Sequence, residues 1–479
     1  MTQSFIHKSD NNNFYLYDDH RMLSMLVHPE FEKVCKSSTD IDPYYIEKYA
    51  YLKNYGFFAK PKLANLETVI DESTVKESII QTQQIIFEVT DLCNLNCTYC
   101  VFGELYEEFD AKNQKHINTR NSITLLKYIF NQRPLKKNRK LGISFYGGEP
   151  LLNIRFIKRI VEVANQLNSE KEIDISFSIT TNATLIHQHI HFLVKNNIRL
   201  LISLDGNEEN QSYRVFSDSK KNSFQKVIEN IDMIKRCYPK YFDSNVNFNA
   251  VLHNRNSVKE IYDFIFTRYH KIPRIAELAL ANVKSDKKAL FKRMFHNKRK
   301  SEDEYQNEES SLLHHDDLLL YKELTDFLKY NSINFYISNI IALLIDVDKY
   351  WPTNTCIPFS KRIFFTNRNK LLPCERINRK YTMGYVDEDV IIDIPEITQK
   401  LNFYYECLKK VCQYCYAYKY CGICMFSNIN NLDKLDVEGF VCEYFNDKNT
   451  FENKLNRIFS FLEKYPNDFF QILENVVFT

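Results

Sequence analysis

The segment Cys93-Asn94-Leu95-Asn96-Cys97-Thr98-Tyr99-Cys100 contains three cysteines with the spacing C-x3-C-x2-C, and it follows the apolar run Ile85–Val89. Cysteine thiolates are soft ligands that bind iron–sulfur clusters. Three thiolates can hold three irons of a [4Fe-4S] cluster and leave the fourth iron open for chemistry. A structural zinc site is the alternative, but it needs four protein ligands, usually as two pairs. No fourth cysteine or histidine lies near this segment, so the spacing favours a cluster with an open iron.

The composition limits the classes of protein and partner. A chain of 479 residues that is 44% hydrophobic can fill more than one core. Its net charge of +2, from 63 basic and 61 acidic residues, gives no general attraction to nucleic acid or to an anionic membrane. The N-terminus lacks an apolar signal core, and the longest apolar run, Ile340–Val347, is far shorter than the roughly 20 residues that span a bilayer. We therefore predict a cytoplasmic protein without nucleic-acid or membrane partners.

The 13 cysteines fit this compartment best as metal ligands, because disulfides are rare in the cytosol. Ten of them fall into patterned groups. Cys35 and Cys237 lie outside these groups, in expected helices, and we predict that they are buried as small hydrophobic side chains.

Residues 1–80 look like a separate small domain. Strands 14–17 and 22–26 flank the polar turn 18–21 and predict a hairpin, and helices are expected over 29–36 and 44–55. A hairpin followed by short helices resembles a winged-helix module. The alternative is that these residues only cap the larger domain.

Residues 84–282 alternate between strands and amphipathic helices. The expected strands are 84–89, 141–146, 173–180, 198–204, 245–252 and 274–281, and the expected helices are 121–132, 152–167, 184–196, 222–236 and 257–269. This alternation predicts a parallel sheet with right-handed crossovers. The fold class is therefore α/β, and six units indicate a partial (β/α)6 TIM-like barrel.

Polar residues follow four successive strands of this expected barrel. The first strand runs into the cysteine segment, and the next three end in Gly147-Gly148-Glu149-Pro150, in Thr180-Thr181-Asn182 and in Ser203-Leu204-Asp205-Gly206, with Arg214 shortly after. Ligands of such folds bind at the C-terminal ends of the strands. We expect these residues to form one site there.

Together with Tyr99, these segments resemble the radical S-adenosylmethionine (SAM) superfamily. The resemblance implies that SAM chelates the open iron and that an electron from the cluster cleaves its sulfonium, which gives a deoxyadenosyl radical that takes a hydrogen atom from the substrate. It implies that Tyr99 lies beside the adenine and that Gly147, Gly148 and Glu149 contact the SAM amino group. Asn182, Ser203 and Arg214 match positions that contact the ribose and the carboxylate.

Residues 283–350 break the strand–helix alternation. Lys284–Lys300 is basic and Glu302–Glu309 is acidic, and neither segment shows an apolar period. We expect a solvated charged insertion, followed by bridging helices up to residue 350. Residues 446–479 are expected to form a C-terminal helical segment.

A second cysteine region covers residues 351–445. Its seven cysteines are Cys356, Cys374, Cys412, Cys415, Cys421, Cys424 and Cys442, and a hairpin is expected over 362–375 with its turn at 367–369. The pattern resembles the SPASM domain, the auxiliary-cluster extension of radical enzymes that modify peptides and proteins. It departs from that family in the two-residue spacing between Cys421 and Cys424 and in Asn369, which replaces a glycine but tolerates the left-handed conformation. A zinc ribbon is the alternative.

The resemblance implies two auxiliary [4Fe-4S] clusters, and so three clusters with the SAM-binding one. Cys412, Cys415, Cys421 and Cys442 would hold the first completely. Cys356, Cys374 and Cys424 would hold the second with one iron short of a ligand, which Cys407 or the substrate could supply.

The segments 146–153, 213–215 and 358–361 resemble Bacteroidales-type maturases of ribosomally made peptides. The resemblance implies an enzyme that installs an oxidative thioether or carbon–carbon cross-link in a precursor peptide, whose leader binds residues 1–80 by strand addition. A reductant such as flavodoxin or ferredoxin would supply electrons. Glu375 looks similar to the acidic residue with which sulfatase-maturing enzymes take a proton from substrate, although it could be a surface carboxylate.

Two other functions stay open. One is a maturase of a folded protein side chain, as in sulfatase maturation. The other is a non-catalytic protein that binds a leader or transfers electrons. The intact cysteine triplet and Gly147-Gly148-Glu149 argue against this second alternative.

Overall fold

The computed structural model describes most of the chain between residues 4 and 464. The residues outside the description are 1–3, 20–22, 59–65, 107–114, 134–139, 170, 172, 280–282, 299, 302–303, 305–350, 354, 419–420, 422, 430–431, 433–434, 436–440, 443 and 465–479. The expected bridging helices before residue 350 and the last part of the C-terminal segment lie outside the described residues.

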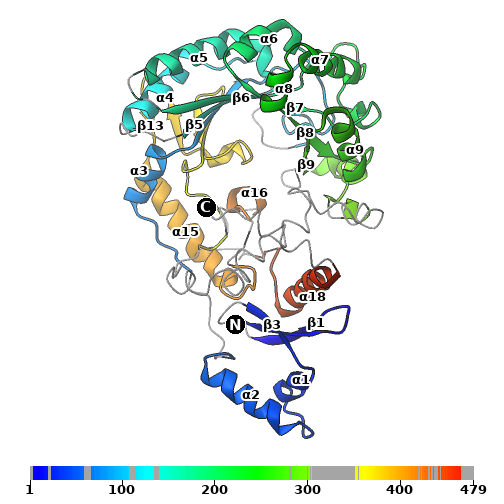
Figure 1. Ribbon diagram of the computed structural model, residues 1–479. Helices are drawn as coiled ribbons and strands as arrows, with labels where there is room; N and C mark the ends of the chain where they lie inside the picture. The colour runs from blue at the N-terminus through cyan, green and yellow to red at the C-terminus, as the bar shows by residue number, and fades with distance from the viewer. Residues whose placement is uncertain are drawn as a thin grey trace.

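A ten-stranded sheet forms the centre of the molecule, in the order β13-β12-β11-β10-β4-β5-β6-β7-β8-β9 (Figure 1). Six consecutive strands pair in parallel: β4 Gln84–Thr90, β5 Lys140–Gly147, β6 Asp174–Thr181, β7 Arg199–Ser203, β8 Val246–Leu252 and β9 Arg274–Glu277. The six expected strands are confirmed, and β9 ends earlier than expected. Their sequential order is the topology of a singly wound partial barrel.

Helices cover the outer side of this curved sheet (Figure 1). They are α4 Thr119–Gln132, α5 Ile154–Asn168, α6 Ile186–Lys195, α7 Phe224–Cys237, α8 Pro239–Asn245 and α9 Val258–Tyr269. Helix α5 buries Phe156, Ile157, Ile160, Val161 and Ala164, which recur at helical spacing on one face. The five expected helices are therefore confirmed, and each packs its apolar stripe against the sheet.

The predicted hairpin is also confirmed, as β10 Arg362–Phe365 and β11 Lys370–Leu372, and Asn369 adopts the left-handed conformation with φ of 62°. Its place in the fold was not predicted. Strand β10 pairs in parallel with β4, and β12 Gly384–Val386 and β13 Val390–Ile391 continue the same sheet. The cysteine-rich region thus begins as an extension of the barrel sheet, and it continues into α15 Ile394–Cys412 and α16 Met425–Asn428.

The N-terminal segment forms an antiparallel sheet of β1 Phe5–Lys8, β2 Phe14–Asp18 and β3 Leu23–Val27, then α1 Glu30–Cys35, α2 Pro43–Asn54 and α3 Glu72–Ile80. The hairpin and both predicted helices are confirmed, and β1 is an additional strand. The sheet packs on the C-terminal helix α18 Lys448–Lys464, where the Tyr15 hydroxyl donates to Glu463 Oε1 at 2.6 Å. Phe5 and Tyr17 contact Phe451 and Tyr416 in a shared aromatic cluster.

Two expectations were wrong. Part of the basic segment is not solvated, because it forms α10 Lys288–Met294 and buries Phe291 and Met294 against the barrel. Cys35 and Cys237 are exposed rather than buried, since each is the last residue of an amphipathic helix. Short 3-10 helices occupy Pro150–Asn153, Asn210–Tyr213, Ser285–Lys287 and Arg379–Tyr381. In the part of the chain that the structure describes, no helix is both long and apolar enough to cross a membrane.

Candidate active site

The cysteine triplet lies in the loop that follows β4, at the C-terminal end of the first barrel strand. Burial raises the pKa of the Cys97 thiol to about 12, and the neighbouring Cys100 and Cys93 raise it further, although Arg214 opposes them. The three thiols are therefore close enough to influence one another. Asn182 Nδ2 and the Leu95 amide face Cys93 Sγ at 3.7 and 3.4 Å, and such N–H groups stabilise a thiolate.

Three converging thiols fit a cluster that is bound through three irons, because thiolates are the natural ligands of iron–sulfur centres. Among the described residues, no group of three or more His, Cys, Asp or Glu side chains is close enough to hold a single metal ion.

The Gly147–Gly148 backbone lies directly against the start of the cysteine loop. The Gly148 amide donates to Thr90 O and the Glu149 amide to Leu92 O, both at 2.8 Å. Gly147 has φ of 123°, and a Cβ on Gly148 would lie 2.0 Å from Leu92 O. Only glycine fits this approach, and Leu92 is the residue before the first cysteine.

Replacing Gly148 with alanine should therefore lower the free energy of unfolding of the apoprotein by about 3 kcal/mol, because a rigid backbone carbonyl occupies the space of the new methyl group. Gly142→Ala, in strand β5 just before this segment, is the matched control, since its Cβ would lie closest to the flexible Gln84 side chain, at 3.3 Å, and only in ordinary contact with Gln83 O, at 3.6 Å. Urea denaturation measures both variants. Equal stability of the two would contradict the close packing between the strand end and the cysteine loop.

The Glu149 carboxyl is fully buried, and protein groups occupy both of its oxygens. Oε1 accepts hydrogen bonds from the Leu151 amide at 3.0 Å and the Thr181 hydroxyl at 2.8 Å, and Oε2 accepts from the Asn182 amide at 2.7 Å. Burial raises its pKa from 4.5 to about 7, against these hydrogen bonds. The carboxyl thus joins the ends of β5 and β6, and the backbone of the Gly-Gly-Glu segment lies toward the cysteine loop.

This buried carboxyl should make stability depend on pH. The folded state holds its proton more tightly than the unfolded state, so the stabilisation is complete below about pH 4.5 and is lost as the pH rises through about 7. One pKa unit corresponds to about 1.4 kcal/mol, so the loss is about 3 kcal/mol. Glu149→Gln should therefore gain about this much relative to wild type between pH 5 and 8, in urea denaturation of the apoprotein.

The comparison of two proteins isolates Glu149 from other titrating groups. His7 is also buried, and burial lowers its pKa to about 4, which gives a pH dependence of opposite sign in the same range. His7 is present in both proteins and cancels in the difference. Parallel stability curves for wild type and Glu149→Gln would contradict the prediction.

Asn182 contacts the cysteine loop, whereas Ser203 lies at the end of the next strand, β7. Asn182 Nδ2 donates to Asn94 Oδ1 at 2.9 Å, and its Oδ1 accepts from the Thr184 amide at 3.0 Å. Ser203 ends β7 and is half-buried. Both residues lie on successive strand ends, as the sequence predicted, and their SAM contacts stay a prediction.

Arg214 is held by a residue whose role the sequence did not reveal. Its Nε and Nη2 donate to Asp205 Oδ2 and Oδ1 at 2.9 and 3.0 Å, and both side chains are buried. Although burial alone would raise the pKa of Asp205, Arg214 and His253 hold it well below its usual range. These two hydrogen bonds occupy Nε and Nη2 of Arg214, the residue for which the sequence predicted a contact with SAM.

Tyr99 is buried in the same place. Its hydroxyl donates to Asp205 Oδ2, and its ring stacks on His253 with centroids 5.6 Å apart. His253 is a site residue that the sequence reasoning missed, and Asp205 was expected at the site without a role of its own. A signal existed for both, because Asp205 belongs to the polar segment after the fourth strand and His253 directly follows the fifth, at the same edge of the sheet.

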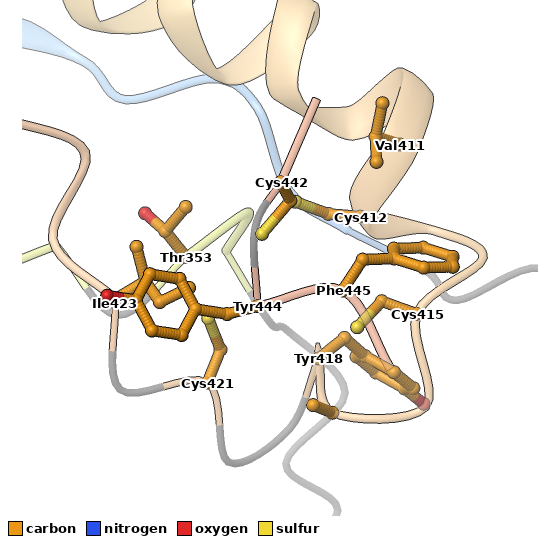
Figure 2. Close-up of a pocket in the computed structure, with 11 residues that line it drawn as sticks. Thr353, Val411, Cys412, Cys415, Tyr418, Cys421, Ile423, Cys442, Tyr444 and Phe445 are labelled. Carbon is orange, nitrogen blue, oxygen red and sulfur yellow. The ribbon is translucent and has the colours of Figure 1, made fainter. Parts of the chain in front are cut away.

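Four of the remaining cysteines line one pocket near the C-terminus of α15. Cys412, Cys415, Cys421 and Cys442 surround it together with Thr353, Tyr444 and Phe445, and Figure 2 shows their sulfurs directed toward a common space. Burial raises the pKa of Cys412, and Cys421, Cys415 and Cys442 raise it further. The donor set fits a fully ligated [4Fe-4S] cluster.

The other auxiliary cysteines lie in two places. Burial raises the pKa of Tyr405, and Cys424 and Cys356 raise it further, so both thiols lie near this tyrosine. Their chain neighbours are also bonded, because the Met425 amide donates to Thr355 Oγ1 at 2.8 Å. Cys374 follows β11, where its thiol donates to Glu375 Oε2 at 3.3 Å. Cys407 is buried on α15 and lies two residues from Tyr405, so it projects about 200° around the helix from that side chain.

Glu375 lies at the border between the barrel and the cysteine-rich region. Its Oε1 accepts from Arg362 Nη1 at 2.7 Å, and its side chain is only 14% exposed. Burial raises the pKa of Tyr146, and Glu375 and Cys100 raise it further. One tyrosine therefore lies close to both the cysteine triplet and Glu375, and Tyr146 is another site residue that the sequence reasoning did not single out.

Comparison with known proteins finds a family model that matches most of the barrel. Residues 87–265 match the model of the radical SAM superfamily. This segment contains the cysteine triplet, the Gly-Gly-Glu segment, Asn182, Asp205 and Arg214.

Curated relatives match the same part of the chain. The radical SAM cyclopropyl synthase TigE of Paramaledivibacter caminithermalis is 29% identical over 179 residues, which cover 36% of this chain and 36% of that protein. A cysteine-type anaerobic sulfatase-maturating enzyme of Clostridium novyi is 31% identical over 176 residues, 36% of this chain and 44% of the relative. The matched part is thus less than half the length of either relative.

A solved structure resembles a larger part of the chain. Native anSMEcpe with bound AdoMet aligns with a TM-score of 0.54 and 18% sequence identity, over 82% of this chain and 99% of that protein. At this identity the likeness concerns the fold alone.

Proposed function

We propose that this chain, a radical SAM enzyme by its domain at residues 87–265, modifies a ribosomally made precursor peptide through an oxidative thioether or carbon–carbon cross-link. The observation that carries the proposal is the convergence of Cys93, Cys97 and Cys100 beside the Gly147–Gly148 backbone. A cluster bound there would supply the electron that cleaves SAM and so generates the radical that abstracts hydrogen.

The residues of this chain hold and shield that chemistry. The three thiols would bind the cluster, and the Gly147–Gly148 backbone packs against the carbonyls of Thr90 and Leu92 and so fixes the start of the cysteine loop. Asn182 and Ser203 offer polar groups at neighbouring strand ends. The buried Tyr99 and Glu149 and the partly buried Tyr146 limit the access of solvent to this place.

A cross-link removes two hydrogen atoms from the peptide, so a proton and an electron must leave after the first abstraction. Glu375 is the proposed proton acceptor, because its carboxylate and the Cys100 thiol both lie near Tyr146. The four-cysteine pocket is the proposed site of an auxiliary cluster that takes the electron. A flavodoxin or ferredoxin would supply the reducing electron to the first cluster.

The second auxiliary cluster is proposed to rest on Cys356, Cys374 and Cys424 with one iron open. Helical geometry supports leaving Cys407 out of this set, because Tyr405 faces Cys356 and Cys424 and Cys407 projects to the other side of α15. An open iron could bind a substrate cysteine thiolate and hold it for attack by a carbon radical.

The decisive experiment uses the anaerobically reconstituted, full-length protein with SAM, dithionite and the peptide encoded by a precursor gene next to its own. The expected products are deoxyadenosine and a peptide that has lost two hydrogen atoms, in equal amounts. Fragmentation by tandem mass spectrometry identifies the joined residues. Formation of deoxyadenosine without any change in the peptide would contradict the proposed substrate. The absence of both products would contradict the proposed radical SAM activity.

The N-terminal sheet is the proposed leader-binding site. Strand β3 pairs with β2 on one side, and Leu26 on β3 is 65% exposed. A leader that added a strand at this edge would cover Leu26, and burial of a leucine is worth roughly 1.5–3 kcal/mol. Leu26→Asp should therefore weaken leader binding by about 10- to 100-fold, as measured by fluorescence anisotropy with a labelled synthetic leader peptide.

Val69→Asp is the matched control, because Val69 is 68% exposed but lies outside the sheet. Point variants suit this test better than removal of residues 1–80, since β1 and β2 share an aromatic cluster with Tyr416 and Phe451. Unchanged affinity in Leu26→Asp would mean that the sheet serves only to cover α18.

A second candidate is a maturase that oxidises a side chain of a folded protein. The similarity to a sulfatase-maturating enzyme over 176 residues and the position of Glu375 favour it. Turnover of a synthetic peptide with a sulfatase cysteine motif, in the absence of any leader, would support this candidate over the first.

A further inference from the structure

Asp205 is the centre of a buried network that joins the ends of several barrel strands. Its carboxylate is fully buried and accepts two hydrogen bonds from Arg214, one from the Tyr99 hydroxyl and one from the Val251 amide at 2.9 Å. His253 Nε2 lies 3.7 Å from Oδ2. One side chain thus binds groups from the cysteine loop, from the segment after β7 and from β8.

The cysteine loop also pairs through its backbone with the segment that carries Arg214. The Asn96 amide donates to Val215 O at 2.8 Å and the Thr98 amide to Tyr213 O at 3.4 Å. Cys97 and Arg214 are the residues between these two bonds, so they lie opposite each other. The Arg214 guanidinium lies 5.3 Å from the centre of the Tyr99 ring. A buried cation is therefore fixed next to the middle cysteine, and Asp205 neutralises it.

We propose that Asp205 is a positioning residue for the three-cysteine cluster, and that the Asp205–Arg214 pair sets the charge at Cys97 and with it the reduction potential of that cluster. Asp205 holds Tyr99, and so the loop between Cys97 and Cys100, through one oxygen and holds Arg214 through both. The inference rests on the cluster of the proposed function and goes further, because it names the residues that tune it.

The sign of each effect follows from electrostatics. Reduction adds one electron to the cluster, so a nearby positive charge favours the reduced form and a nearby negative charge opposes it. Both charges are buried, where screening by water is weak. Loss of the Asp205 charge leaves Arg214 uncompensated and should raise the potential. Loss of the Arg214 charge should lower it, and loss of both should return it close to the wild-type value.

The test is a redox titration, followed by electron paramagnetic resonance, of the full-length reconstituted protein. The three-cysteine cluster is identified as the signal that changes when SAM is added. The variants are Asp205→Asn, Arg214→Gln and the double variant, and Asp218→Asn is the control, because Asp218 is exposed and its charge is screened. We expect opposite shifts in the two single variants, near cancellation in the double variant and no shift in the control.

Shifts in the same direction, or none, would overturn the inference, because a role in packing alone predicts no opposed signs. Should Asp205→Asn fail to fold, Arg214→Lys and Arg214→Gln decide the matter. Arg214→Lys keeps the positive charge and should keep the wild-type reduction potential, and Arg214→Gln should lower it. Equal potentials in these two variants would overturn the inference. A wild-type protein with no SAM-responsive cluster would overturn the proposed function as well, so the two failures are distinguishable.

Discussion

Replacement of Cys93, Cys97 and Cys100 together by alanine is expected to remove about four of roughly twelve iron atoms per chain and to abolish the cleavage of SAM. The physical reason is that the three thiols converge at the end of β4 and are the proposed ligands of the cluster with the open iron. Without that iron SAM cannot be chelated or reduced, and formation of deoxyadenosine should fall by a millionfold or more, to below detection. Iron analysis and chromatography of deoxyadenosine measure the two effects.

The control for this variant is the replacement of Cys35 and Cys237 by alanine. Both thiols are exposed and lie outside the cysteine groups, so iron content and cleavage should stay at the wild-type level. Deoxyadenosine from the triple variant at a rate near that of wild type would refute the assignment. Zinc in place of iron, in protein purified without oxygen, would refute it equally.

Replacement of Cys412, Cys415, Cys421 and Cys442 by alanine should separate radical formation from product formation. These four thiols line one pocket far along the chain from the triplet, so their loss should remove about four iron atoms. The triplet would still cleave SAM, but the electron that leaves the substrate would lack its acceptor. We therefore expect deoxyadenosine without a cross-linked peptide.

The persistence of deoxyadenosine is itself the control for folding in this variant. A milder change, Cys415→Ser, tests the same site, because Cys415 Sγ accepts from the Asn446 amide at 3.4 Å and a serine oxygen can accept this bond. Cross-linked peptide in wild-type yield from the four-cysteine variant would show that these thiols carry no electron in the reaction.

The local chemistry of the chain was evident from the sequence by itself. Alternating strands and amphipathic helices predicted the six barrel strands, because these patterns depend on residues a few positions apart. The cysteine spacing located the triplet at the first strand end. The hairpin turn at Asn369 was predicted for a similar reason, since asparagine tolerates the positive φ of 62° that the turn requires.

Contacts between distant parts of the chain were decided only by the tertiary structure. Strand β10 extends the barrel sheet beside β4, and the buried pair of Glu88 and Arg379, 2.7 Å apart, joins β4 to the 3-10 helix Arg379–Tyr381 from positions about 290 residues apart. No periodic pattern in the sequence predicts which distant strand pairs with β4, because that choice depends on which other strands pack and pair in the same sheet.

The site shows the same division. The sequence by itself determined which residue types reach the C-terminal ends of the strands, because the order of strands and loops is fixed along the chain. Only the tertiary structure decided that Arg214 lies opposite Cys97, that Asp205 occupies both arms of its fork, and that Tyr99 donates to the same carboxylate. A buried charge must find a partner in three dimensions, and that partner is set by the packing of whole strands rather than by its neighbours in sequence.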